Sequence, residues 1–241
     1  PVLLCPPLVY TTPMRYYPLL LDLHGRACLV VGAGGVGRRK LASLLDCGPA
    51  RVLVLDANPQ APDDPELAPL LAHPAVRFEA RPFVPADVDG CALVFAATGN
   101  RAVNAAVADA CRQRNVPCNV ADAPETGAFI VPAHFACGDL TVALSTGGHS
   151  PALARRIRMD LQQWFGARYD AITVLLGRLR PLVLALGHET GQNTALFRAV
   201  VESPLIDALA ARDRAGAERI LTELLPAELH PRIVELLHEL A

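Results

Sequence analysis

Apolar runs of four or five residues recur along the first half of the chain, each bounded by glycine, proline or polar residues. Runs of this length predict buried β strands, whereas two longer segments between them carry the apolar spacing of amphipathic helices. Alternating strands and helices predict an open parallel sheet in an α/β domain. The predicted strands are Cys28–Val31, Arg51–Leu55, Val76–Glu79, Leu93–Ala97 and Pro117–Val120, and the predicted helices are Arg38–Leu45 and Arg101–Arg114.

The first predicted strand runs directly into a glycine-rich turn, Gly32-Ala-Gly-Gly-Val-Gly37. Between a strand and a helix, this G-x-G-x-x-G spacing is typical of a Rossmann-type dinucleotide-binding turn. Gly32 permits the tight turn, Gly34 lets a pyrophosphate approach the backbone, and Gly37 lets the helix pack closely on the strand. Free N–H groups at the helix N-terminus attract the phosphates. The sequence therefore predicts a dinucleotide site here.

The second predicted strand ends at Asp56, 19 residues beyond Gly37. An acidic side chain at this place accepts hydrogen bonds from the adenosine ribose and repels a 2′-phosphate. No arginine follows it closely in the sequence. We therefore expect NAD rather than NADP as the cofactor.

Three remaining parts of this half carry weaker signals. Leu19–Leu23 is apolar enough to add an edge strand, and Pro59–Pro69 is expected to be a loop with a short helical turn after Pro65. Asn100 is a suitable N-cap for the helix that begins at Arg101.

The pattern changes after Val120. Two β-type runs, Ala128–Phe135 and Leu140–Ser145, predict an antiparallel hairpin, which has no place in a βαβ series. From Pro151 to the end the chain has helical character, with breaks expected at Gly187–Gly191, Ser203–Pro204, Asp213–Gly216 and Pro226. We therefore expect a Rossmann-type domain at residues 14–120, a hairpin-and-helix segment at 121–165, and a helical domain at 166–241.

Composition excludes several other classes of protein. Hydrophobic residues make up 52% of the chain, but no apolar run approaches the length that crosses a bilayer. A net charge of −2 argues against binding to nucleic acid or to membrane surfaces. The seven cysteines form no C-x-x-C pair, and they and the histidines show no metal-ligand spacing. We expect a cytoplasmic protein without a metal site.

Two further candidates follow predicted strands, on the side where ligands bind in such sheets. Thr98 and Gly99 are placed to contact the ribose or nicotinamide of the cofactor, although they also suit a turn before a helix. Asp122 ends the next strand, where a carboxylate can act as general base when a hydride leaves a carbon. Aspartate before Ala-Pro is equally a common turn former.

A second glycine-rich turn, Thr146-Gly-Gly-His-Ser150, leads into a predicted helix that carries Arg155 and two further arginines. Such a helix start can hold an anion, and arginines can bind carboxylates in pairs of hydrogen bonds. A solvated basic helix face is the alternative. The candidate substrate-binding residues are Thr146, Gly147, Gly148, His149, Ser150 and Arg155.

Taken together, these motifs resemble the precorrin-2 dehydrogenase and sirohydrochlorin ferrochelatase family, which includes the N-terminal half of bacterial sirohaem synthase. The resemblance extends from Tyr17 to about residue 165, with weaker agreement in the C-terminal helices. It implies NAD-dependent oxidation of precorrin-2, a tetrapyrrole rich in carboxylates, to sirohydrochlorin, and in some members insertion of ferrous iron. It is carried by the runs VVGAGGVGRRK, AATGN, CNVADAP, FIVPA and LSTGGHSPALARRIR.

The resemblance also implies roles for single residues. The family's essential aspartate corresponds to Asp122, and its NAD contacts correspond to Gly35, Val36 and the segment Asp56-Ala57-Asn58. A homodimer is implied, in which the hairpin and the following helix make contacts between subunits, and arginines around Arg155 become counter-charges for the substrate. The serine that is phosphorylated in some fused relatives corresponds to Thr146, which argues against the same regulation here.

Two alternatives to this enzyme remain open. One is a regulatory protein that senses NAD or binds a tetrapyrrole without catalysis, and the other is a Rossmann dehydrogenase of a small hydroxy acid. We also expect a natural start at or near Met14, after a proline-rich leader of residues 1–13. The chain stops at Ala241 without a methyltransferase half, so we expect a separate enzyme to carry out the methylations that come earlier in the pathway. Iron insertion by this chain or by a separate chelatase remains open.

Overall fold

The structure, a computed structural model, describes residues 15–165 and 168–240. The chain divides into two compact units, the first ending at Val131 and the second beginning at Pro132. The expected boundaries at residues 120 and 165 remain a prediction. The expected leader and the start at Met14 lie outside the described residues.

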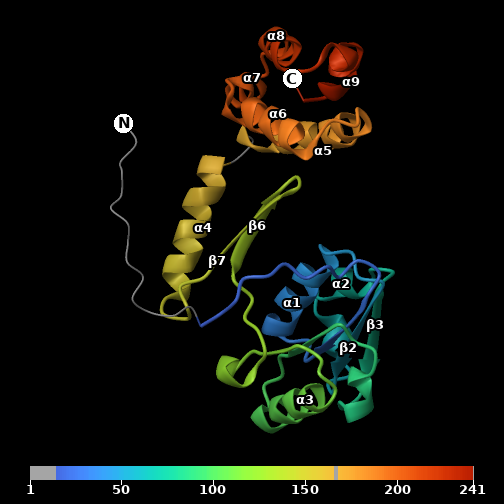
Figure 1. The fold of residues 1–241 in the computed structure, drawn as a ribbon. Helices are drawn as coiled ribbons and strands as arrows, with labels where there is room; N and C mark the ends of the chain where they lie inside the picture. The colour runs from blue at the N-terminus through green and yellow to red at the C-terminus, as the bar shows by residue number, and fades with distance from the viewer. Residues whose placement is uncertain (1–14, 166–167, 241) are drawn as a thin grey trace. The chain divides into compact units, whose positions relative to one another are not determined.

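A five-stranded parallel sheet forms the centre of the first unit, in the strand order β3-β2-β1-β4-β5 (Figure 1). All four strand pairs are parallel, as the alternation of strands and helices predicts. The order reverses between β1 and β4, and ligands bind at such a switch point in doubly wound sheets. The strands are β1 (Ala27–Val31), β2 (Arg51–Asp56), β3 (Val76–Ala80), β4 (Leu93–Ala96) and β5 (Cys118–Val120).

Helices cover both faces of this sheet, and successive side chains of each strand point to opposite faces. Leu29 and Val31 of β1 pack in one apolar cluster with α3 (Arg101–Gln113). Cys28 and Val30 pack in another with α1 (Gly35–Leu45). Smaller elements complete the unit: α2 (Ala68–Leu71), η1 (Ala61–Asp63), η2 (Pro85–Val88) and η3 (Pro124–Thr126).

The structure corrects two expectations at the ends of this unit. Leu19–Leu23 forms no strand: its leucines at 19 and 20 are exposed, and only Leu23 joins the core. The first hairpin strand begins at Ala133 rather than Ala128. Residues before it are held by β5 instead, since Ala128 N donates to Cys118 O at 2.8 Å and Asn119 Nδ2 donates to Phe129 O at 2.9 Å.

Helix α1 begins at Gly35, three residues earlier than the expected start at Arg38. Gly35 and Gly37 therefore lie in the first turn of the helix, and Gly34 is its N-cap. The short helix expected after Pro65 is α2, which begins at Ala68.

The second unit contains the predicted hairpin, followed by helices. Strands β6 (Ala133–Cys137) and β7 (Leu140–Leu144) pair antiparallel, and Cys137 lies opposite Leu140. The two-residue turn between them needs a positive φ, which Gly138 supplies at +55°. Helix α4 (Pro151–Phe165) follows and contacts β6.

A separate apolar core holds the C-terminal helices together, with Leu175, Leu179, Leu205 and Leu221 among its fully buried side chains. The breaks expected at Ser203–Pro204 and Pro226 separate helices as predicted. The other two are shorter than expected, because α6 already begins at Thr190 and α8 at Arg214. The helices are α5 (Asp170–Ala185), α6 (Thr190–Glu202), α7 (Leu205–Ala210), α8 (Arg214–Leu224), η5 (Ala227–Arg232) and α9 (Ile233–Leu236).

Candidate dinucleotide and acid–base site

The glycine-rich turn has the geometry that a pyrophosphate requires. Gly32 has a φ of +100°, and a Cβ there would lie 2.5 Å from Ala97 O. At Gly37 a Cβ would overlap the carbonyl oxygen of Gly32, whereas at Gly34 it would meet nothing within 4 Å. The first and last glycines therefore allow close backbone packing, and the middle one leaves open space beside the helix start.

The N-terminus of α1 is free to receive an anion. Gly34 is its N-cap and has no side chain to accept from the helix, and the backbone bond from Arg38 N to Gly34 O closes the first turn. The N–H groups of Gly35, Val36 and Gly37 therefore lack partners within the helix. Unpaired N–H groups and the positive end of the helix dipole fit a pyrophosphate.

A cleft of about 430 Å³ lies beside this turn. It brings together several of the sequence-predicted residues from three strand ends: Gly32 and Gly34 after β1, Asp56 and Ala57 after β2, and Thr98 and Gly99 after β4. Gly35, Val36, Gly37 and Asn58 do not line it. Sequence reasoning did not name as site residues the other residues of the wall, which are Val31, Leu55, Arg81, Pro82, Phe83, Ala97, Asn100, Val103 and Ala106.

Asp56 is half-buried and uses both carboxylate oxygens to order the backbone around it. Its Oδ2 accepts from Ala33 N at 2.7 Å, and its Oδ1 accepts from Asn58 N at 2.9 Å. Each carboxylate oxygen has more than one acceptor position, so both can still accept from ribose hydroxyls.

Arg81 is a cation in the cleft wall that sequence spacing did not indicate, because it follows β3 rather than β2. Its guanidinium is held by two carboxylates, with 2.7 Å from Nε to Glu79 and 2.7 Å from Nη2 to Asp87. These hydrogen bonds raise the pKa of Arg81, and the hydrogen bond from Arg81 lowers the pKa of Asp87. The charge of Arg81 is thus already balanced within the protein.

Helix α3 begins beside the cleft with the predicted cap. Asn100 Oδ1 accepts from Ala102 N at 2.9 Å and from Val103 N at 3.3 Å. Across the turn before the helix, Asn100 N donates to Thr98 Oγ1 at 3.2 Å. Thr98 and Gly99 therefore serve as turn residues and also line the cleft.

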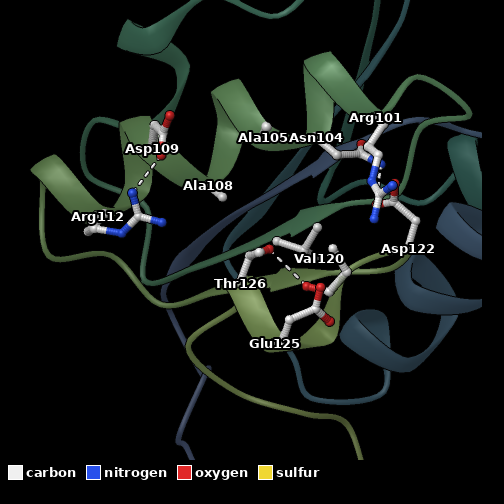
Figure 2. A pocket seen from close by; sticks show the side chains of 11 residues that line it. Arg101, Asn104, Ala105, Ala108, Asp109, Arg112, Val120, Asp122, Glu125 and Thr126 are labelled. Atoms are coloured by element: carbon white, nitrogen blue, oxygen red, sulfur yellow. Dashed lines mark hydrogen bonds and ion pairs between the residues drawn. The ribbon is translucent and has the colours of Figure 1, made fainter.

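Asp122 does not line the dinucleotide cleft. It is exposed and lines a smaller cavity of about 170 Å³, between α3 and the segment that follows β5. Figure 2 shows Asp122 with Arg101 and Asn104 at one end of this cavity, and Asp109 with Arg112 at the other. Asp122 Oδ1 accepts from Asn104 Nδ2 at 2.8 Å. Because Asn104 also bonds Thr98, one side chain connects Asp122 to the wall of the cleft.

The second predicted anion site lies in the second unit, before α4. Thr146 Oγ1 donates to Ser150 O and accepts from Ser150 N, each at 3.1 Å, and Ser150 Oγ caps the helix by accepting from Leu153 N at 3.2 Å. Gly147 and Gly148 turn with φ of +64° and +89°, and His149 is exposed.

The three arginines of α4 differ in their partners. Arg156 pairs with Asp160 at 3.0 Å, and Arg158 donates to Gln162 Oε1 at 2.5 Å. Arg155 is exposed and has no ion pair within the described residues. Of the three, Arg156 alone is paired with a carboxylate in the described part of the chain, so the charges of Arg155 and Arg158 are not balanced by an ion pair there.

Neither a metal centre nor a membrane-spanning helix is found among residues 15–165 and 168–240. No three histidine, cysteine or acidic side chains in that part of the chain are grouped to hold a metal ion. None of its helices combines the length and the apolar character needed to span a bilayer.

Two family models match parts of the chain. Residues 19–133 match the family described as putative NAD(P)-binding, and residues 138–163 match the family described as sirohaem biosynthesis protein, central. The first match supports a nicotinamide dinucleotide as the cofactor and does not distinguish NAD from NADP.

Several curated relatives are sirohaem synthases. That of Methylococcus capsulatus is 38% identical over 211 residues, which cover 87% of this chain and 43% of the relative. That of Pseudomonas fluorescens strain SBW25 is 36% identical over 210 residues, or 87% of this chain and 44% of the relative. The chain thus spans less than half the length of these relatives.

A solved structure agrees with both units of the fold. It is titled SirC, precorrin-2 dehydrogenase, and it matches with a TM-score of 0.68 and 25% sequence identity over 87% of this chain and 98% of that one. The match confirms the predicted architecture of a Rossmann-type domain, a hairpin and C-terminal helices. Over most of its length the chain is thus similar in sequence to the sirohaem synthases, and similar in fold to a precorrin-2 dehydrogenase.

Proposed function

We propose that this chain oxidises precorrin-2 to sirohydrochlorin and passes the hydride to NAD. The observation that carries the proposal is the match to almost the whole of SirC, a precorrin-2 dehydrogenase, by a chain whose own cleft fits a dinucleotide. When bound, the dinucleotide supplies the hydride acceptor. The substrate gives up a hydride and a proton, so the protein must provide a site for the proton.

The choice of NAD over NADP rests on charge. Asp56 places a carboxylate at the end of β2, where it would repel a 2′-phosphate. The nearby cation in the cleft wall, Arg81, is engaged by Glu79 and Asp87 and is not free to balance that phosphate. Both observations favour a cofactor without a 2′-phosphate.

Asp122 is the residue we propose as general base. It follows β5, and one of its two oxygens is held by Asn104, so the carboxylate has a defined orientation. A carboxylate held in this way can accept a proton as general base. The glycine turn binds and orients the cofactor by backbone N–H groups, which need no rearrangement during the reaction.

The substrate's many carboxylates call for cations, and Arg155 is our candidate together with the turn Thr146–Ser150. A homodimer in which the hairpin and α4 meet their counterparts is part of the same proposal. Exposed apolar side chains on α4, among them Leu153 and Trp164, support it because such side chains are stabilised by contact with a second subunit.

The deciding experiment is an anaerobic assay of the purified chain with freshly prepared precorrin-2 and NAD. We expect NADH and sirohydrochlorin to form in equal amounts, and NADP to be used far less well. Binding of both ligands without NADH formation would instead support a non-catalytic sensor or carrier. Because the methylated substrate is supplied, the result does not depend on where methyltransferase activity resides.

Ferrous iron insertion is tested in the same vessel. If the chain inserts iron, ferrous iron added after oxidation is complete should consume sirohydrochlorin faster than in a protein-free control. If the two rates are equal, a separate chelatase is needed.

The role of Asp122 is tested by Asp122→Ala. We expect loss of oxidation with NAD binding retained, because Asp122 does not line the dinucleotide cleft. Asp46→Ala removes an exposed aspartate at the other end of α1 and is the matched control. Undiminished turnover by Asp122→Ala would reject this residue as the base.

A further inference from the structure

The side chain of Asn104 is a buried polar group whose hydrogen bonds are all made within the first unit. It lies in α3, is 1% exposed, and is flanked along the helix by Val103 and by the fully buried Val107. A polar group in such surroundings is costly unless all of its hydrogen bonds are made. Those of Asn104 are made to Thr98 and Asp122.

Four hydrogen bonds saturate this amide. Oδ1 accepts from Thr98 N at 3.1 Å and from Thr98 Oγ1 at 2.7 Å. Nδ2 donates to Thr98 O at 3.0 Å and to Asp122 Oδ1 at 2.8 Å. An amide has two donor hydrogens and two acceptor positions, so none remains for another partner.

The orientation of the amide follows from its backbone partners. Thr98 N–H can only donate and Thr98 O can only accept, so Oδ1 must face the first and Nδ2 the second. Reversing the amide would set donor against donor and acceptor against acceptor. It is therefore an N–H group that faces Asp122, and Asp122 Oδ1 must act as an acceptor.

We propose that Asn104 is a positioning residue, which holds the Asp122 carboxylate and the Thr98 turn together so that Asp122 Oδ2 takes the substrate's proton. Oδ1 is occupied by the amide, whereas no hydrogen bond or ion pair of the described residues reaches Oδ2. Through Oδ1, the same amide links the Asp122 carboxylate to Thr98, a residue of the cleft wall. The inference rests on the proposed function, since it assigns the geometry of the proposed base.

Other charged groups share the cavity with Asp122 and bear on any pH profile. Arg101, Asp109 and Arg112 come from α3, and Glu125 comes from η3. Asp109 and Arg112 form an ion pair with each other at 2.5 Å. Arg101 and Glu125 have no ion pair in the described part of the chain, and both remain in place in the variants below.

Asn104→Asp is the main test, because a carboxylate of the same shape keeps the acceptor for Thr98 N and Oγ1. It replaces the group that donates to Thr98 O and Asp122 by an oxygen and adds a second negative charge beside Asp122. Two adjacent carboxylates hold a proton more tightly. We expect the acidic limb of the kcat/KM profile to move to higher pH, while the Kd of NAD changes less than threefold. Asn104→Ala loses both contacts and should lower kcat by about a hundredfold.

The exchange Asn104→Asp with Asp122→Asn separates positioning from mere support of the fold. It restores a complementary amide–carboxylate pair, so the Tm should return toward that of the natural chain while oxidation stays lost. Asn119→Ala is the structural control: it removes another buried amide bond, to Phe129 O, and should lower the Tm without moving the pH profile.

The outcomes keep this inference distinct from the proposed function. An unmoved acidic limb in Asn104→Asp, or a profile that moves equally in Asn119→Ala, overturns the positioning role. If the natural chain itself does not oxidise precorrin-2, the proposed function fails; the Tm of the exchanged pair then still decides whether residues 104 and 122 are coupled. An exchanged pair no more stable than either single variant overturns that coupling.

Discussion

The carboxylate of Asp56 accepts a hydrogen bond from the backbone N–H of Ala33, with 2.7 Å between Oδ2 and N. The two residues lie 23 positions apart, at the ends of neighbouring strands. This bond ties the ribose end of the cleft to the glycine-rich turn. The shape of the pyrophosphate site thus depends on the residue that we expect to select the cofactor.

Asp56→Asn should weaken NAD binding by about tenfold or more. Both oxygens of Asp56 accept hydrogen bonds from backbone N–H groups, whereas an amide has only one acceptor oxygen. The ratio of NADP to NAD affinity should rise, since a repelling charge is removed. Titration calorimetry with both cofactors measures these changes. Asp63→Asn, which neutralises an exposed aspartate of η1, is the control. Equal losses in both variants would argue that net charge, rather than this carboxylate, governs binding.

Gly34→Asp should abolish NAD binding while the chain stays folded. A Cβ at Gly34 meets nothing within 4 Å, and its φ of −66° suits any residue, so the fold accepts the change. The added carboxylate would stand where the pyrophosphate is expected and repel it. Circular dichroism and calorimetry check the two halves of this prediction. Gly191→Asp adds the same charge at an open position in α6 and should bind NAD normally.

Gly37→Ala should destabilise the first unit by about 1–3 kcal/mol or more, because the new methyl group would overlap the Gly32 carbonyl. Gly35→Ala, two residues earlier in the same helix turn, meets nothing within 4 Å and should gain about 0.5–1 kcal/mol from helix propensity. Denaturant unfolding of the ligand-free chain compares the pair. Similar stabilities for the two variants would contradict the close packing of α1 on the glycine turn.

The hydrogen bond from Arg81 lowers the pKa of Asp87 in the folded chain. A lowered pKa means that the unfolded state binds the proton more readily, so the ion pair stabilises the fold above a pH of about 4 and is lost as the pH falls further. The stability difference between the natural chain and Asp87→Asn should therefore be largest at neutral pH and shrink in acid. Chemical unfolding across this range measures it. A difference that grows toward low pH would contradict this sign.

Local patterns were sufficient to predict most of the first unit. Strands such as Cys28–Val31 are short apolar runs, and the glycine turn follows directly, so strand, turn and helix are neighbours in sequence. The spacing from Gly37 to Asp56 also follows from one strand–helix–strand unit. The predicted start of the hairpin strand at Ala128 was wrong. Ala128 has the character of a strand residue, but its N–H donates to Cys118 O of β5 rather than to a hairpin partner.

The residues that complete the candidate site could not be identified from local pattern. Arg81 follows β3 and reaches the cleft only because β3 pairs with β2. Asn104 stands out in the sequence only as a polar residue on an apolar helix face. Its partners Thr98 and Asp122 lie at the ends of β4 and β5, which become neighbours when the sheet forms.

By itself, the sequence determined the parallel sheet, the glycine turn and the choice of Asp56 and Asp122 as candidates, because strand period, turn chemistry and family motifs are properties of consecutive residues. Only the tertiary structure decided that Asp122 lies outside the dinucleotide cleft, that Arg81 lines it with its charge balanced, and that Asn104 joins base and turn. Those facts depend on hydrogen bonds between separate strands and helices, whose partners are chosen by packing.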